Sequence, residues 1–92
     1  MAKAIATVRI MPASPEIELE SLEKKSLEKI KSFNDNGETK VKKEPVAFGL
    51  KSINITFVMD EARGSPDPVA EEIAEFEEVA SAEVIDVRRA IG

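Results

Sequence analysis

The order of apolar patterns predicts an α+β fold in which strands and helices follow one another as β-α-β-β-α-β. Apolar and polar residues alternate in residues 3–11 and 52–59, which is typical of half-buried strands. Apolar residues recur every three or four positions in residues 16–33 and 67–80, which is typical of helices packed on one side. With 92 residues, 42% of them hydrophobic, the chain suits a single domain over residues 1–92.

The first strand is expected over residues 3–11, and its buried face carries small and branched side chains: Ala4, Ala6, Val8, Ile10. Pro12 ends this strand. Ser14 and Pro15 are typical of an N-cap followed by proline at the first helical position, so we expect the first helix to begin there. This helix should run to about Phe33, because one side repeats at helical spacing: Leu19, Leu22, Ser26, Leu27, Ile30, Phe33.

A lysine-rich edge strand is expected over residues 38–45, after a turn at residues 34–37 whose Asn, Asp and Gly residues tolerate positive φ. Pro45 cannot donate to a strand ladder, which also favours an edge. The following strand, with its strongly apolar face, should be central. Phe48 lies between the two strands beside Gly49, and two interpretations stay open: it fills the core, or a hairpin presents it to a partner.

The second helix is expected to take Ser65 or Asp67 as its cap and to bury a stripe of side chains: Val69, Ile73, Phe76, Ala80. A last strand is expected from Ala82 to Ile91, at an edge of the sheet. Right-handed crossovers then give an antiparallel sheet of order 4-1-3-2 with both helices on one face. This arrangement is a ferredoxin-like sandwich.

The composition argues against several kinds of site. The chain has no cysteine and no histidine, so it lacks disulfides, thiolates and the usual zinc ligands. Acid–base catalysis at neutral pH would require a carboxyl group or lysine with a strongly shifted pKa, so we expect neither an enzyme nor a cofactor. The carboxylates of the second helix lack the spacing of a calcium loop and are expected to be solvated.

The formal charge of −5, from 18 acidic and 13 basic residues, opposes binding to nucleic acid or anionic membranes and favours a protein partner. No apolar run approaches the roughly 18 residues of a membrane span, and the start of the sequence resembles a strand rather than a signal peptide. We therefore expect a soluble, unprocessed cytoplasmic protein. RNA-binding members of this fold need aromatics on the central strands, where this chain has polar residues: Thr7, Arg9, Asn54, Thr56.

Three segments carry a resemblance to a known family: Val8-Arg9-Ile10-Met11-Pro12, Pro45-Val46-Ala47-Phe48-Gly49-Leu50-Lys51-Ser52-Ile53, Val79-Ala80-Ser81-Ala82-Glu83-Val84. Together they resemble translation elongation factor 1-beta, in particular its short archaeal type, which consists of the nucleotide-exchange domain alone. The resemblance implies an α/β sandwich that binds the GTPase elongation factor 1-alpha and speeds replacement of GDP by GTP during protein synthesis. The alternative from the fold alone is a small-ligand regulatory or dimerisation domain.

The resemblance also implies which residues contact the GTPase. Phe48 matches the aromatic of the family's Phe-Gly-hydrophobic-Lys segment, and Gly49 and Lys51 match its neighbours. Arg89, with Arg88 beside it, stands where eukaryotic relatives carry a lysine that reaches the magnesium site of the GTPase. Both arginines also have a plainer interpretation as solubilising residues of an edge strand. The predicted topology places Phe48 and Arg89 at opposite ends of the sheet, roughly 20 Å apart.

Overall fold

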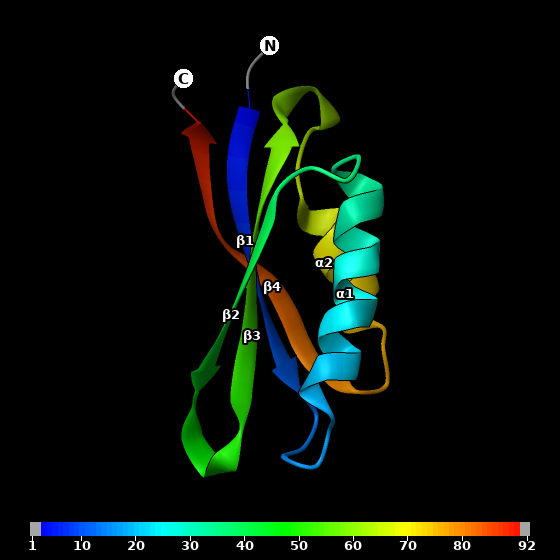
Figure 1. Cartoon of the computed structure of the whole chain (residues 1–92), viewed down its shortest axis with the longest axis vertical. Coiled ribbons are helices and arrows are strands. Elements are labelled where there is room, and N and C mark those ends of the chain that lie inside the picture. The colour runs from blue at the N-terminus through cyan, green and yellow to red at the C-terminus, as the bar shows by residue number, and fades with distance from the viewer. Residues whose placement is uncertain (1–2, 91–92) are drawn as a thin grey trace.

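The computed structural model describes residues 3–90, whose four strands form one antiparallel sheet with two helices on one face (Figure 1). The strands and helices are β1 (Lys3–Pro12), α1 (Leu19–Phe33), β2 (Thr39–Pro45), β3 (Lys51–Asp60), α2 (Asp67–Ala74) and β4 (Val79–Ala90). Two single 3-10 turns, η1 (Ala47–Gly49) and η2 (Glu61–Arg63), flank β3. The sheet order β2-β3-β1-β4 is the predicted order 4-1-3-2 read from the other edge, so the ferredoxin-like prediction is confirmed.

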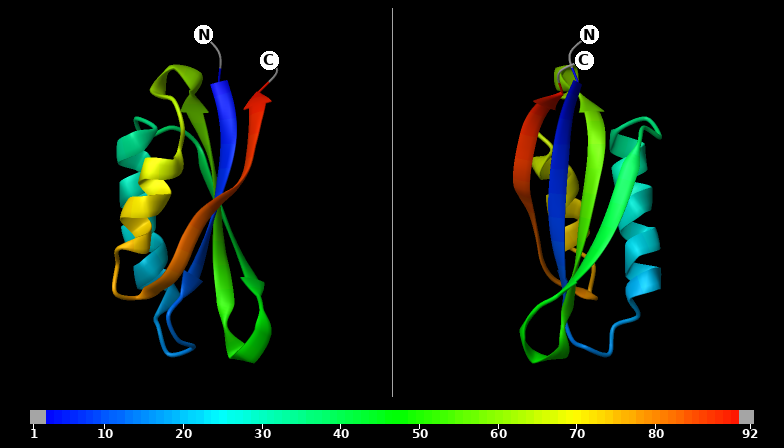
Figure 2. Two further views of the ribbon diagram at one scale, coloured as in Figure 1. Left: turned by 180° about the vertical axis from the view of Figure 1, so that it is seen from behind. Right: turned by 60° about the vertical axis from the view of Figure 1, so that its left-hand side comes forward.

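The core lies between the sheet and the helices, and the opposite face of the sheet is uncovered (Figure 2). β1 is central and alternates between buried and partly exposed residues along its whole length, as its sequence predicts. β3, the other central strand, contributes a matching set of buried side chains: Ile53, Ile55, Phe57, Met59. Residues of β1 and β3 that pair across the sheet therefore share one apolar face, which both helices cover.

Helix α1 begins at Leu19, so the expected start at Ser14 is wrong. Residues 13–18 instead form a turn that leads from the end of β1 into the helix layer. In this turn the Ala13 amide donates to the Glu78 carbonyl at 2.7 Å, and the Ile17 amide donates to the Ser14 carbonyl at 3.3 Å. The local capping signal is thus overridden by a tertiary hydrogen bond. The predicted apolar stripe is confirmed, with Leu22, Ser26 and Ile30 buried.

Helix α2 ends at Ala74, earlier than its apolar spacing predicts, and β4 begins at Val79 rather than Ala82. The reason is pairing with β1, which extends to the pair Pro12 and Val79 and draws Ala80 into the strand. Phe76 still packs against the core from the turn between them. β4 is an edge strand, as predicted, and its expected end at Ile91 lies outside the described residues.

The turn after α1 is confirmed. Asp35 and Asn36 adopt φ values of 54° and 60°, in the left-handed region that short polar side chains tolerate. Asn34 is buried, and its Nδ2 donates to the Val58 carbonyl at 3.0 Å. This side-chain bond joins the end of α1 to β3 and returns the chain to the edge strand β2.

Candidate functional site

The hairpin between β2 and β3 presents Phe48 to solvent. The Phe48 backbone lies in the left-handed region, with φ 61° and ψ 33°, and Gly49 follows with φ 75°. The Val46 amide donates to the Leu50 carbonyl at 2.8 Å and closes the tip. Phe48 is 93% exposed, so the core-filling interpretation is wrong; the hairpin holds Phe48 in solvent, and its contact with a partner stays a prediction. A non-glycine residue in this region costs roughly 1 kcal/mol, which the closed hairpin offsets.

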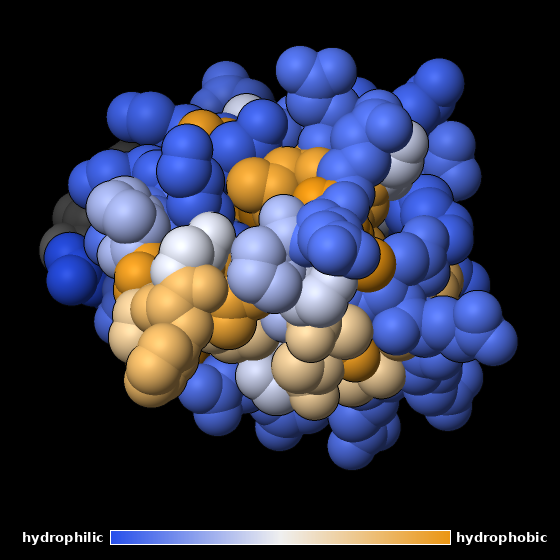
Figure 3. Space-filling view, turned by 90° about the horizontal axis from the view of Figure 1, so that it is seen from below, coloured by the Kyte–Doolittle hydropathy of each residue, from blue (hydrophilic) through white to orange (hydrophobic). Residues whose placement is uncertain are grey.

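Phe48, Gly49 and Lys51 lie together at one end of the molecule, which we call the hairpin end: residues 46–51 with the loop at residues 13–18. Gly49 and Lys51 line a small cleft of about 210 Å³ whose other wall is that loop, including Pro15 and Ile17. Figure 3 looks onto this end and shows apolar side chains among charged ones. The predicted neighbours of Phe48 therefore share its surface.

Arg88 and Arg89 lie at the opposite end, which we call the arginine end: residues 88–89 with the turn η2. Arg89 pairs in the sheet with Ala4, which faces the helices, whereas Arg88 pairs with Ile5 on the uncovered face. The two neighbouring guanidinium groups thus leave opposite faces of the sheet. Their side chains are 74% and 77% exposed.

Each arginine has one carboxylate partner. The Nε atom of Arg89 donates to Oε1 of Glu61 at 2.9 Å, across from β4 to η2. The Nε atom of Arg88 donates to Oδ2 of Asp86 at 2.8 Å, within β4 itself. The structure therefore ties Arg89 to another element and Arg88 only to its own strand.

The two ends are far apart, as predicted, because β3 runs the length of the molecule between them (Figure 1). At roughly 3.3 Å per residue, its ten residues span about 30 Å, which exceeds the expected 20 Å. The principal extents of 42 × 20 × 17 Å agree with that length. Phe48 and Arg89 cannot enter the same pocket of a partner.

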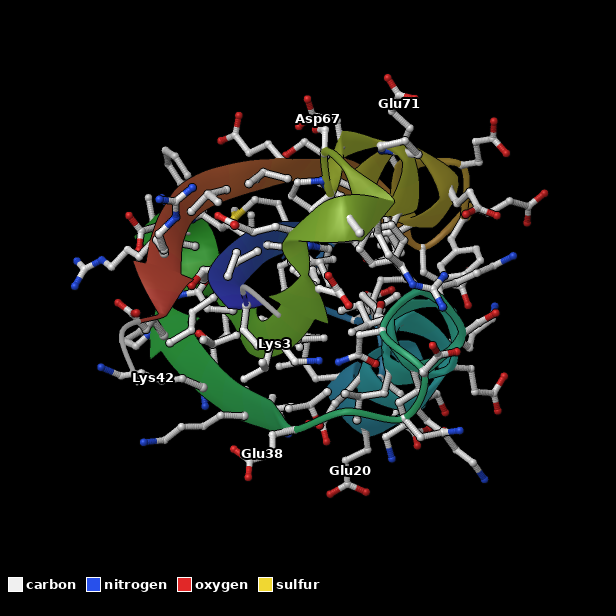
Figure 4. The ribbon with its side chains drawn as sticks, turned by 90° about the horizontal axis from the view of Figure 1, so that it is seen from above. Lys3, Glu20, Glu38, Lys42, Asp67 and Glu71 are labelled. Atoms are coloured by element: carbon white, nitrogen blue, oxygen red, sulfur yellow. The ribbon has the colours of Figure 1, made fainter. Side chains whose placement is uncertain are left out.

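The remaining charged side chains are mostly solvated. Figure 4 views the whole domain along its long axis from the arginine end; Lys3 lies near the centre of this view, and Glu20, Lys42 and Glu71 point outward around it. Within residues 3–90, no group of three or more His, Cys, Asp or Glu side chains is placed to hold a metal ion. No helix in that range is long and apolar enough to cross a membrane.

Residues 5–90 match the family described as the EF-1 guanine nucleotide exchange domain. The chain belongs to this family. It is 40% identical over 90 residues to elongation factor 1-beta of Methanosphaera stadtmanae, covering 97% of this chain and 98% of that protein. It is 44% identical over 87 residues to elongation factor 1-beta of Methanococcus maripaludis strain S2, with 95% and 97% covered.

A solved structure named de novo designed protein Foldit4 superposes with a TM-score of 0.67 and covers 98% of both chains, at 19% identity. At that identity the likeness concerns the fold alone. Membership in the exchange-domain family confirms the resemblance found in the sequence. The chain is a guanine nucleotide exchange factor for elongation factor 1-alpha in translation.

Sequence reasoning missed Glu61, which holds the side chain of Arg89. The two residues are 28 positions apart and belong to no shared periodic pattern. In the sequence, Glu61 lies in a short loop, and nothing distinguishes it from the many other carboxylates of the chain. Only the strand registers reveal the pair, because they set Arg89 opposite Ala4 and, across β1, level with Met59 near the end of β3.

Proposed function

We propose that residues 1–92 act as one exchange domain that contacts elongation factor 1-alpha through both of its ends. Phe48, Gly49 and Lys51 form the contact at the hairpin end, and Arg89 with Arg88 forms it at the arginine end. The observation that carries this proposal is the 93% exposure of Phe48 on a closed hairpin. Aromatic side chains are among those that most often dominate binding energy when a partner buries them.

Exchange requires this domain to bind the nucleotide-free GTPase more tightly than the GDP-bound form. Thermodynamic linkage makes the effect mutual. A tenfold loss of GDP affinity caused by the domain requires a tenfold loss of domain affinity caused by GDP, which is about 1.4 kcal/mol. Phe48 supplies binding that is independent of the nucleotide, and the arginine end supplies the part that opposes GDP.

Arg89 is the residue proposed to disturb the phosphate and magnesium region of the GTPase. Its guanidinium is permanently charged and offers planar donors that suit carboxylate and phosphate oxygens. By pairing with such oxygens it would compete with the magnesium ion that helps to hold GDP. Arg88 leaves the other face of β4, so its proposed contact is with a neighbouring surface of the GTPase rather than the same pocket.

The proposed partner is a protein alone. A net charge of −5 opposes direct contact with nucleic acid and with anionic membranes. The proposed role involves no bond making or breaking by the domain, needs no cofactor, and belongs to the cytoplasm, where translation elongation takes place. Exchange depends on differential binding rather than on a shifted pKa or a nucleophile.

The test is release of fluorescent GDP from elongation factor 1-alpha of the same source at fixed magnesium concentration. The domain should speed release with a saturating dependence on its concentration. Arg89→Ala should slow the maximal rate about tenfold, since hydrogen bonds to charged groups contribute roughly 1.5 kcal/mol. Glu71→Ala, which removes an exposed carboxylate of α2, is the control and should behave as wild type. No acceleration by a folded domain would refute the proposal.

A further inference from the structure

We propose that Glu61 is a positioning residue for exchange, because it holds the Arg89 side chain in the direction in which it meets the GTPase. This inference rests on the proposed role of Arg89. Glu61 Oε1 accepts from Arg89 Nε at 2.9 Å, and the Glu61 side chain is 32% exposed against 74% for Arg89. The carboxylate is therefore the better anchored member of the pair.

The backbone around Glu61 is fixed by local hydrogen bonds. Oδ1 of Asp60 accepts from the Ala62 amide at 2.9 Å and caps the turn η2. The Gly64 amide donates to the Glu61 carbonyl at 3.0 Å, and Gly64 has φ 81°, which suits glycine. Glu61 thus stands on a closed turn at the end of a central strand.

A second contact ties the same turn to helix α1. Arg63 Nη2 donates to Oδ2 of Asp35 at 2.6 Å, and the Arg63 guanidinium lies 5.9 Å from the centre of the Phe33 ring. The turn η2 therefore reaches α1 through Arg63 and β4 through Glu61. Because Arg63 fastens this turn next to the end of α1, the turn is a suitable support for the residue that orients a long, flexible side chain.

The geometry indicates orientation rather than sequestration. The hydrogen bond from Arg89 to Glu61 uses Nε, one of the five N–H donors of a guanidinium. The bond involves neither terminal amino group, so their four N–H donors stay available on a side chain that is 74% exposed. Glu61 therefore restricts the rotamers of Arg89 while the groups that would meet an anionic oxygen stay accessible.

The neighbouring arginine provides the contrast within the same strand. Arg88 Nε donates to Asp86, which is only two residues away and belongs to β4 as well. That pair moves with the strand and fixes nothing relative to the rest of the fold. A positioning role at this end is thus specific to the pair that joins two elements, Glu61 and Arg89.

The pair should matter for exchange and not for folding. Exposed ion pairs contribute little to stability. Their small energy corresponds to a change of about two- to fivefold in the population of the paired Arg89 rotamer. Glu61→Ala should therefore lower the maximal exchange rate by about two- to fivefold, while the melting temperature falls by only a few degrees and the domain stays folded. Glu61→Gln should restore most of the rate, because the amide oxygen still accepts from Arg89 Nε.

The experiment measures maximal GDP release by wild type, Glu61→Ala, Glu61→Gln, Arg89→Ala and the double variant Glu61→Ala/Arg89→Ala. Once Arg89 is removed, Glu61→Ala should have no further effect. The control is Glu72→Ala, which removes a helix carboxylate that is paired with Lys29 at 3.5 Å and is more exposed than Glu61, 57% against 32%. This variant should leave the rate unchanged.

The outcomes separate the inference from the function on which it rests. A slow Arg89→Ala with a normal or faster Glu61→Ala overturns the positioning role and leaves the proposed role of Arg89 intact. Equal losses for Glu61→Ala with and without Arg89 also overturn it, because the effect would then be independent of the pair. A normal rate for Arg89→Ala overturns the role of Arg89 and the inference together.

Discussion

The two ends of the domain hold their proposed contact residues in different ways. At the hairpin end, the backbone fixes Phe48, since two consecutive residues take positive φ and a short hydrogen bond closes the tip. At the arginine end, an exposed side-chain pair fixes Arg89. A backbone-held contact is present before the partner arrives, whereas a side chain oriented by one pair of low energy can still adjust when it meets the partner.

This difference matches the proposed role of each end in exchange. An anchor that binds every nucleotide state of the GTPase gains from a fixed backbone, because little backbone freedom is lost on docking. A group that competes with magnesium must gain new partners during the reaction, which the terminal amino groups of Arg89 allow while Nε stays on Glu61. The sheet between the two ends sets their separation, since β1 and β3 pair along nearly their whole length.

The largest expected effect comes from the core that joins both ends. Phe57 is 1% exposed and meets Phe33 edge-on, with ring centres 6.2 Å apart. Phe57→Ala should lower the free energy of unfolding by about 3–5 kcal/mol, because it leaves a cavity. Urea unfolding measures this loss, and exchange should fall with the folded fraction. A variant that kept its stability but lost exchange activity would contradict the view that the sheet supports both ends.

The next effect separates function from folding. Phe48→Ala should slow exchange at least about thirtyfold at subsaturating concentration, since removing a central aromatic anchor typically costs 2 kcal/mol or more. Its stability should change by less than about 0.5 kcal/mol, because the side chain is 93% exposed. GDP release and thermal unfolding give the two numbers. A large loss of stability without a specific loss of exchange would show that the tip is structural.

The sequence predicts the fold well because strand and helix periodicity reflect burial, and burial dominates here. It predicts β1 and β3 nearly residue for residue. It fails at the start of α1, where the capping signal of Ser14 and Pro15 loses to the bond between Ala13 and Glu78, residues distant in sequence. A contact of that kind leaves no mark in local spacing.

The candidate site was predictable only in part. The resemblance identified five residues, and the structure groups three at one end and two at the other. The residue pattern left open whether Phe48 fills the core or faces solvent, and the folded hairpin decides it, since Phe48 on the closed tip is 93% exposed. The opposite faces of Arg88 and Arg89, and the support from Glu61, follow from strand register, which depends on the whole sheet.

A smaller effect tests whether the backbone alone holds the hairpin end. Gly49 has φ 75°, and a Cβ placed there would meet nothing within 4 Å. Gly49→Ala should therefore cost roughly 1 kcal/mol, because the strain lies in the backbone and not in crowding. Urea unfolding measures the cost, and exchange should fall less than for Phe48→Ala. Unchanged stability together with unchanged exchange would mean that the tip tolerates another conformation.

The smallest effect concerns a side-chain contact at the hairpin end, where the turn before β4 meets residue 13. Lys25 Nζ donates to Glu78 Oε2 at 2.7 Å, and this hydrogen bond lowers the pKa of the Glu78 carboxyl below 4.5. Because the folded pKa is depressed, the stabilisation is present above the unfolded pKa and is lost as pH falls through the folded one. Melting temperature should therefore drop less between about pH 5 and pH 3 in Glu78→Gln than in wild type. Lys25→Met should flatten the curve in the same way, since it removes the donor. Parallel plots of melting temperature against pH for all three proteins would show that the pair of Lys25 and Glu78 does not stabilise this end.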